Sequence, residues 1–179
     1  MSRVSDIVLF ARYNEWMNIK VYETAGQLSA EELLLDRKAF FGSILGSLNH
    51  IFIADMIWLK RFSHHPANHS ALKVITAMQD PRSLDELRFI NFSELTKQRH
   101  FLDSVILSWT AQLTEEDLEY VVHYRNMKGM PADKKLGSLL LHFFNHQTHH
   151  RGQVSTLLSQ CGLDVGVTDL QALIPDAAD

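Results

Sequence analysis

Four of the ten histidines of this chain fall within twelve residues, in the segment HFFNHQTHHRGQ at residues 142–153. Neutral imidazole binds divalent transition metals, and histidines four residues apart on a helix lie on the same face, where both can reach one ion. The segment contains two pairs with this spacing, His142/His146 and His146/His150. Ten histidines placed at random in a chain of this length would give about half such a pair. Spacing alone therefore does not decide between three interpretations of this segment: a metal site, a proton relay and a solvated surface.

The position of each histidine around its helix separates the pairs. A helix over residues 135–161 turns by about 100° per residue, which places His150 about 40° and Leu139 about 20° from His146. His146 and His150 therefore lie within the apolar stripe that faces the core, whereas His142 lies on its shoulder. Two buried imidazoles need partners. Two kinds of partner are possible at this point: other side chains that form hydrogen bonds with the imidazoles, or a divalent metal that both imidazoles bind.

A third histidine with a similar environment comes from another strongly apolar helix, expected over residues 43–62. His50 lies on the apolar face of this helix, and the small residues Gly46 and Ser47 precede it there, which leaves room beside the imidazole. Three nitrogen ligands without a carboxylate leave at least one coordination position for water or substrate, as in catalytic sites. The sequence therefore predicts a metal site of His50, His146 and His150, but imidazoles do not select the metal.

The remaining histidines are expected to supply no ligand. His65 and His69 flank Pro66 in the polar loop SHHPANHS, where no helix aligns them. His100 lies in the polar stretch TKQRH, and His123 alternates with the apolar face of an extended segment. We expect both of these side chains to face solvent.

The composition indicates one globular domain over residues 1–179. The net charge of −4 gives no basic surface for nucleic acid. No stretch reaches the about 18 to 20 apolar residues that cross a membrane, and the first residues lack the apolar core of a signal peptide. Cys161 is a single cysteine, which fits a reducing compartment. We expect a cytoplasmic protein with no nucleic-acid or membrane partner.

Hydrophobic periodicity predicts four long helices, over residues 4–27, 43–62, 83–113 and 135–161. An additional N-cap is expected at Ser29, with Glu32 three residues later. The third helix is expected to begin at Ser83, with Asn91 as an alternative start. Residues 120–131 alternate and then reach a Lys-Gly turn signal, which predicts a hairpin. With a short helix over 168–174, the pattern predicts an all-α four-helix bundle.

Several stretches resemble the DinB-like (DNA-damage-inducible) family, within the group of metal-dependent thiol-transferase bundles. LGSLNHIFIADMIW resembles its second helix with a single histidine, and LGSLLLHFFNHQTHHRGQVSTLLSQCGLD resembles its fourth helix with the motif H-x-x-x-H-R-G-Q. ARYNEWMN near the start and VTDLQALIP near the end also resemble family features. Together these similarities extend through nearly the whole chain.

The resemblance implies a homodimeric four-helix bundle with one divalent transition metal, Zn or Ni first and Fe, Mn or Co as alternatives. The family's ligand positions fall on His50, His146 and His150, the residues that helical phase also selects. Characterised relatives attach small thiols to electrophiles or isomerise thiol adducts, and many members have no established activity. The family name refers to induction by DNA damage and implies no polymerase activity.

Two functions follow as expectations. The first is a metal-dependent enzyme of the thiol S-transferase type, or a hydrolase, that activates a thiol or water and takes a small-molecule thiol or electrophile. The second is a non-catalytic metal-binding stress-response bundle that acts through a protein partner. Gln153 and Trp16 are candidate substrate-binding residues, and no catalytic base can be named. Arg151 is expected to pair structurally or to lie at the dimer interface, and Gly152 to allow close approach of another helix.

Overall fold

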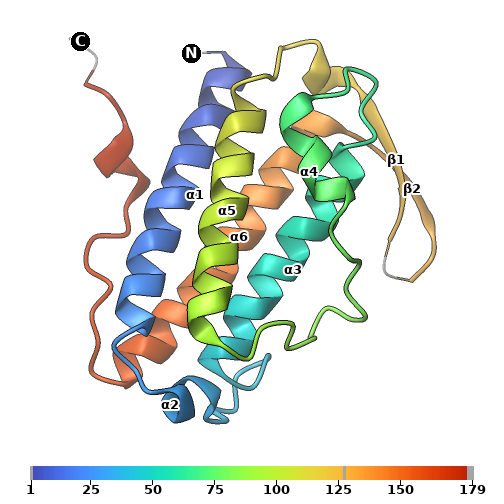
Figure 1. Cartoon of the computed structure of the whole chain (residues 1–179). Coiled ribbons are helices and arrows are strands. Elements are labelled where there is room, and N and C mark those ends of the chain that lie inside the picture. Colours follow the sequence, from blue (N-terminus) through green and yellow to red (C-terminus); the bar gives the residue numbers. More distant parts are fainter. Residues whose placement is uncertain (1, 127, 177–179) are drawn as a thin grey trace.

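The computed structural model describes residues 2–126 and 128–176; residues 1, 127 and 177–179 lie outside this description. Most of the described residues are helical, and four long helices lie side by side (Figure 1). They are α1 (Arg3–Ala25), α3 (Ile44–Phe62), α5 (Phe92–Thr110) and α6 (Leu136–Gln160). α1 packs against α5 and α6, and α3 packs against the same two helices. The apolar core fills the space that these four helices enclose.

The shorter elements lie in the connections. They are α2 (Ala30–Leu34), α4 (Lys73–Thr76), β1 (Val121–Arg125), β2 (Pro131–Lys135) and three 3-10 helices at Ser70–Leu72, Asp117–Glu119 and Leu170–Leu173. Within residues 2–126 and 128–176, no helix combines the length and the apolar composition that a membrane crossing needs.

Helix starts follow the capping signals of the sequence. The Ser43 hydroxyl accepts a hydrogen bond from the Gly46 amide at 3.0 Å at the start of α3. Ser29 and Glu32 form a complete capping box at the start of α2. Side-chain acceptors at these positions satisfy amides that have no partner within the helix. The predictions for these two starts are confirmed.

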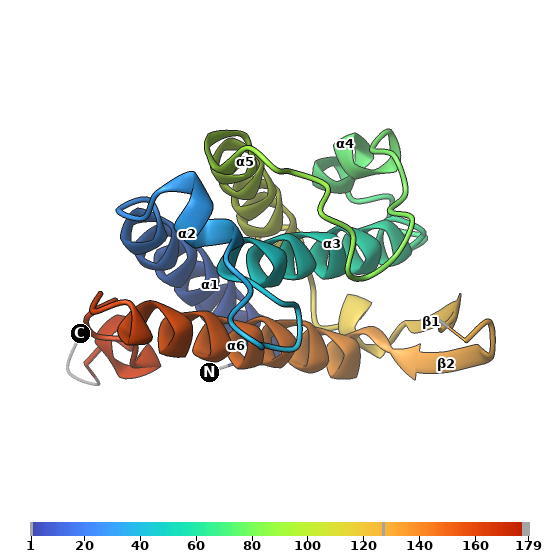
Figure 2. The same cartoon turned by 90° about the horizontal axis from the view of Figure 1, so that it is seen from below.

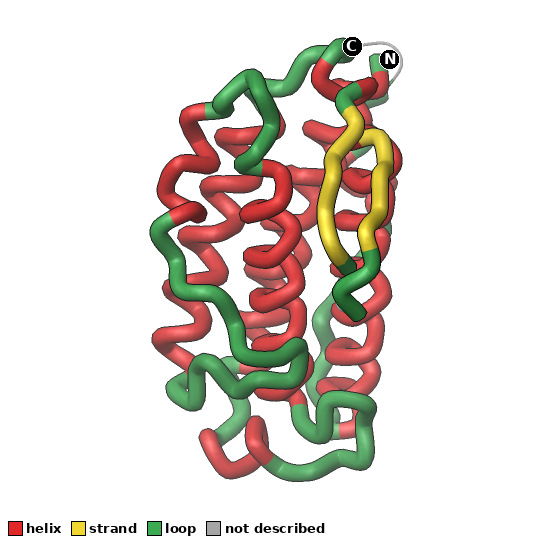
Figure 3. Tube along the Cα trace, turned by 90° about the vertical axis from the view of Figure 1, so that its right-hand side faces the viewer, coloured by secondary structure: helices red, strands yellow, loops and turns green. Residues whose placement is uncertain are grey.

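The predicted start of the third helix at Ser83 is wrong, and the alternative at Asn91 is confirmed. α5 begins at Phe92, and the Asn91 side chain accepts a hydrogen bond from the Glu94 amide at 3.1 Å. Residues 77–91 instead pass outside α3 as an irregular segment (Figure 3).

Hydrogen bonds from α3 explain why this segment is not helical. Asn49 donates to the Phe89 carbonyl at 3.0 Å and accepts from the Phe89 amide at 2.9 Å. The Leu84 carbonyl accepts a hydrogen bond from His50 Nδ1 at 2.9 Å. Side chains of α3 thus satisfy backbone groups that a helix would satisfy internally. The segment is fixed against the helix that carries His50.

The hairpin prediction is confirmed. β1 and β2 pair antiparallel, with Tyr124 opposite Ala132, and Gly129 has a φ of 75° in the connecting turn. Figure 2 shows the hairpin extending beyond the first turn of α6, at the opposite end of that helix from the C-terminal segment.

The two C-terminal predictions have different outcomes. Gly162 has a φ of 79° directly after α6, as the predicted helix stop requires. The helix expected over 168–174 is only a 3-10 turn at Leu170–Leu173.

Charged side chains lie inside the helical core. Arg99 on α5 is 1% exposed and lies between two aspartates: its Nη1 is 2.6 Å from Asp55 of α3, and its Nη2 is 2.9 Å from Asp103. Asn18 of α1 donates to the same Asp103 carboxylate at 2.9 Å. Arg151 of α6 donates to the Asn14 side chain. Each of the four long helices therefore contributes to a buried polar network.

Replacing Arg99 with methionine tests the contribution of this network. The variant keeps a long unbranched side chain but leaves Asp55 and Asp103 buried without their shared counter-charge. We expect the free energy of unfolding, measured by urea denaturation at pH 7, to fall by about 3–5 kcal/mol. The matched control is Lys97→Met on the exposed side of the same helix, which should change stability by less than about 0.5 kcal/mol. Equal stabilities of the two variants would show that the buried charges contribute nothing.

Candidate metal centre

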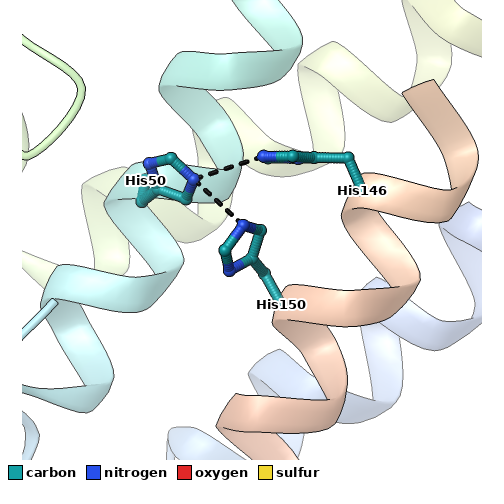
Figure 4. A group of neighbouring side chains, drawn as sticks. All are labelled: His50, His146 and His150. Carbon is teal, nitrogen blue, oxygen red and sulfur yellow. Dashed lines mark hydrogen bonds between the residues drawn. The ribbon is translucent and has the colours of Figure 1, made fainter. Parts of the chain in front are cut away.

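Three histidines from two helices point toward one another in the interior (Figure 4). Nε2 of His50 on α3 lies 3.4 Å from Nε2 of His146 and 3.2 Å from Nε2 of His150, both on α6. Nitrogen ligands at 2.0–2.1 Å from a tetrahedral ion are separated by about 3.3–3.4 Å. The three nitrogens are therefore spaced as ligands of one divalent transition metal.

Hydrogen bonds to the outer ring nitrogens fix which nitrogen faces the centre. His50 Nδ1 lies 2.9 Å from the Leu84 carbonyl, which can only accept, so Nδ1 carries the proton and Nε2 carries the lone pair. His150 Nδ1 lies 2.8 Å from the Gln153 side-chain oxygen, which imposes the same tautomer. Two lone pairs at 3.2 Å repel one another unless a cation lies between them. The donor set of these histidines thus fits a metal cation.

Burial keeps the three imidazoles in the form that binds metals. Burial, followed by the charges of the neighbouring His150 and His50, lowers the pKa of His146 to about 3. The pKa values of His50 and His150 are also lowered, in both cases mainly by burial. The three side chains are therefore neutral at pH 7, with their lone pairs available.

The small residues before His50 do not leave an open space beside it, contrary to expectation. A Cβ at Gly46 would lie 2.2 Å from the Phe41 carbonyl oxygen, so glycine is needed for the preceding loop to pass close to α3. The Phe41 ring stacks on the His50 imidazole, with ring centroids 3.8 Å apart. The loop before α3 therefore closes one side of the centre with an aromatic ring.

The other side of the centre opens into a cavity of about 230 Å³ between α3, α6 and the hairpin. It is lined by His50, Ala54, Ile57, Trp58, Arg61, Leu84, Tyr124, Asn126, His142 and His146. None of these residues is an aspartate or a glutamate. A bound molecule can therefore contact two of the three histidines, and along the described lining it meets no negative charge.

Arg61 supplies a fixed positive charge to this cavity. Its guanidinium lies over the rings of Trp58 and Tyr124, 4.5 and 4.7 Å from their centroids. It donates one hydrogen bond, to the Arg125 carbonyl at 3.0 Å, and no carboxylate of the described residues forms an ion pair with it. Burial, followed by the Arg61 charge, lowers the pKa of His142. The aromatic rings hold this arginine in place and leave its charge uncompensated.

The candidate substrate-binding residues lie elsewhere. Gln153 orients His150 through Nδ1 and contacts His149 Nε2 at 3.3 Å. The Trp16 ring contacts Tyr13 and the ammonium of Lys20 on α1. Neither Gln153 nor Trp16 is among the residues that line the cavity. Helical phase would instead have selected Arg61, which lies about 20° from His50 around α3.

The neighbours of His150 on α6 also differ in outcome. Arg151 is buried and donates to Asn14 and to Gln147, so the expected structural pairing is confirmed. The expectation for Gly152 is wrong, because a Cβ there would meet no atom within 4 Å.

Of the histidines expected to supply no ligand, only some face solvent. His100 and His123 are exposed as expected, and His123 Nδ1 lies 2.7 Å from an Asp133 oxygen. His65 and His69 are instead largely enclosed, which corrects the expectation of an unordered polar loop.

The lowered pKa of His146 predicts the pH dependence of stability in the metal-free protein. In the unfolded chain this histidine titrates near 6.5, and in the folded chain near 3. Between these values the unfolded state binds more protons, so the free energy of unfolding falls as the pH is lowered from 6.5 toward 3. Urea denaturation at several pH values measures this slope. A His146→Leu variant should show a shallower slope, since carboxylate contributions are common to both proteins; equal slopes would contradict the prediction.

Comparison with known proteins assigns nearly the whole chain to one family. The DinB family profile matches residues 1–177. Protein DinB of Bacillus subtilis (strain 168) is 25% identical over 162 residues, which cover 88% of this chain and 87% of that protein. No solved structure matches the chain. The match over nearly all residues shows that this chain belongs to the DinB family.

Proposed function

We propose that this protein is a metal-dependent enzyme that activates a small thiol, or water, for attack on an electrophile. The observation that carries the proposal is the group of His50, His146 and His150, whose Nε2 atoms converge beside a cavity. A bound divalent ion, Zn or Ni first and Fe, Mn or Co as alternatives, would lower the pKa of a thiol or water and so supply the nucleophile. Three neutral ligands leave a coordination position for it.

The protein's own residues supply orientation and charge. The Leu84 carbonyl and the Gln153 side chain hold His50 and His150 with their lone pairs inward. His142 lines the cavity one helical turn before His146, and we assign it the role of accepting the proton that the nucleophile loses. Its lowered pKa keeps it neutral, and so able to accept a proton, at pH 7.

Arg61 favours a substrate with an anionic group. Its guanidinium and the absence of carboxylates from the described cavity lining select a carboxylate or a phosphate. The rings of Trp58 and Tyr124 line the same end of the cavity. We therefore propose that one substrate approaches the histidines while its anionic group contacts Arg61.

The alternative is a non-catalytic metal-binding stress-response protein that acts through a protein partner. The cavity beside His50 and His146 favours the enzyme, because a structural metal site needs no space for a second molecule. The same proposal includes four further properties, which the resemblance to the family supports: assembly as a homodimer, a four-helix bundle architecture, induction by DNA damage and a cytoplasmic location.

Metal content and turnover test the proposed function directly. Protein prepared without a histidine tag or a nickel column should contain a divalent transition metal, and the loaded protein should turn over a member of a panel of thiols and electrophiles. His146→Ala should lose both the metal and the activity, because two imidazoles remain where three are needed. The control is His100→Ala, an exposed histidine on α5, which should retain both. Turnover that persists in His146→Ala would contradict the mechanism.

Replacing Arg61 with methionine tests the expected anionic substrate. Loss of a hydrogen bond to a charged group corresponds to about 1.5–3 kcal/mol, or a rise in KM or Kd of roughly tenfold to 150-fold. The effect should be confined to substrates with a carboxylate or phosphate, and the metal content should not change. Arg12→Met, at an exposed arginine of α1, is the control. An equal loss of affinity for an uncharged amide analogue would show that Arg61 contributes packing and not charge recognition.

A further inference from the structure

A second group of potential ligands lies beyond the end of α3, away from the three-histidine centre. His65 and His69 come from the loop after α3, and Asp117 comes from the 3-10 helix before β1. One ligand atom from each lies within 4.8 Å of the others. Because α3 rises about 1.5 Å per residue, its end is about 18 Å from His50. One ion cannot serve both groups.

The side chains of this group are enclosed but incompletely paired. His65 and His69 are each 6% exposed, and Asp117 is 11% exposed. Their Nε2 atoms lie 3.7 and 3.9 Å from the carboxylate oxygens of Asp117, beyond hydrogen-bonding distance. Among the described residues, neither Nε2 atom has another hydrogen-bond partner. Buried nitrogens of this kind are rare without a ligand, because an unsatisfied polar atom is costly.

The Asp117 carboxylate is held in a fixed orientation by its own neighbours. Its Oδ2 accepts hydrogen bonds from the Thr114 amide at 2.8 Å and from the Thr114 hydroxyl at 2.9 Å. The Tyr120 ring packs edge-on against His65, with ring centroids 4.4 Å apart. These contacts orient Asp117 and His65, as the outer contacts of metal ligands do.

We propose that His65, His69 and Asp117 form a second metal site, which binds a divalent transition-metal cation independently of the three-histidine centre. Two imidazoles and one carboxylate are a donor set suited to Zn, Fe or Mn. An ion at this point fills the gaps of 3.7 and 3.9 Å that separate the imidazoles from the carboxylate.

One hydrogen bond opposes metal binding at this second site. The Ala67 amide donates to His65 Nδ1 at 3.1 Å, so the neutral ring carries its proton on Nε2. Coordination through Nε2 moves this proton to Nδ1 and breaks the bond from Ala67. The Ala67 amide then loses its acceptor, which weakens coordination. We therefore expect the second site to bind metal more weakly than the centre on α3 and α6, where His50 and His150 already carry their protons on the outer nitrogens.

The position of the second site indicates a structural role. An ion there connects the loop after α3 to the segment that leads into β1. β1 carries Tyr124, which lines the cavity and packs against Arg61. The ion thus anchors the hairpin that forms one wall of the cavity.

Metal stoichiometry, measured by mass spectrometry on untagged protein titrated with Zn²⁺, tests this site. We expect two equivalents in the wild type, one in His69→Gln, one in Asp117→Asn and one in His146→Gln. The double variant His69→Gln/His146→Gln should bind none. His64→Gln, at an exposed histidine next to the site, is the control and should retain two equivalents. Far-UV circular dichroism confirms that each variant is folded.

Thermal unfolding provides a second measurement in the His146→Gln background. Added Zn²⁺ should raise the Tm of His146→Gln and leave the Tm of the double variant unchanged. The second site would be overturned, and the first left intact, if the wild type bound a single equivalent of Zn²⁺ that His146→Gln loses and His69→Gln keeps. Two equivalents in both His69→Gln and Asp117→Asn would also overturn it, because the second ion would then bind elsewhere.

Discussion

The Arg99 guanidinium between Asp55 and Asp103 is the constraint on which the arrangement of the helices depends. Three charges at 1% side-chain exposure require close pairing, because a buried charge without a partner is strongly destabilising. The hydrophobic effect has no directional preference, whereas these short charged contacts define one relative position of α3 and α5. The hydrogen bond from Asn18 to Asp103 extends the same requirement to α1.

The same buried contacts determine where the histidines lie. Arg151 follows His150 directly, about 100° farther around α6, and donates to Asn14 of α1. Asp55 lies little more than one helical turn after His50 on α3 and pairs with Arg99. Each helix that carries a candidate metal ligand thus also carries a buried charged residue that pairs with another helix. The spacing of 3.2 Å between His50 and His150 Nε2 requires this arrangement of the two helices, and the hydrogen bonds of His50 with Leu84 and of His150 with Gln153 orient the two rings.

Periodicity and capping signals predict the long helices and the hairpin, because those features depend on residues close together in the sequence. The three histidines could be predicted as neighbours because helical phase places each of them on the core-facing side of its helix, although His50 and His146 are 96 residues apart. The start of α5 was not determined, since it depends on Asn49 and His50 binding the backbone of a distant segment. The roles of Arg61 and Asp117 also escaped prediction. The one local signal for Arg61 is its phase, about 20° from His50 around α3; its contact with Tyr124 comes from the hairpin. Asp117 is paired with a loop more than forty residues earlier in the chain, and such a contact leaves no local pattern.

The donor sets of the two proposed sites imply different chemistry. Three neutral imidazoles compensate none of the charge of a divalent ion, so the field at the cavity would be that of the full charge, reinforced by Arg61 at the other end. Under the proposed function, a negatively charged nucleophile and an anionic substrate would both be stabilised there. The Asp117 carboxylate compensates one unit of charge at the second site, where the side chains are largely enclosed. The three-histidine centre is thus suited to activating a bound group, and the site with the carboxylate to holding two segments together.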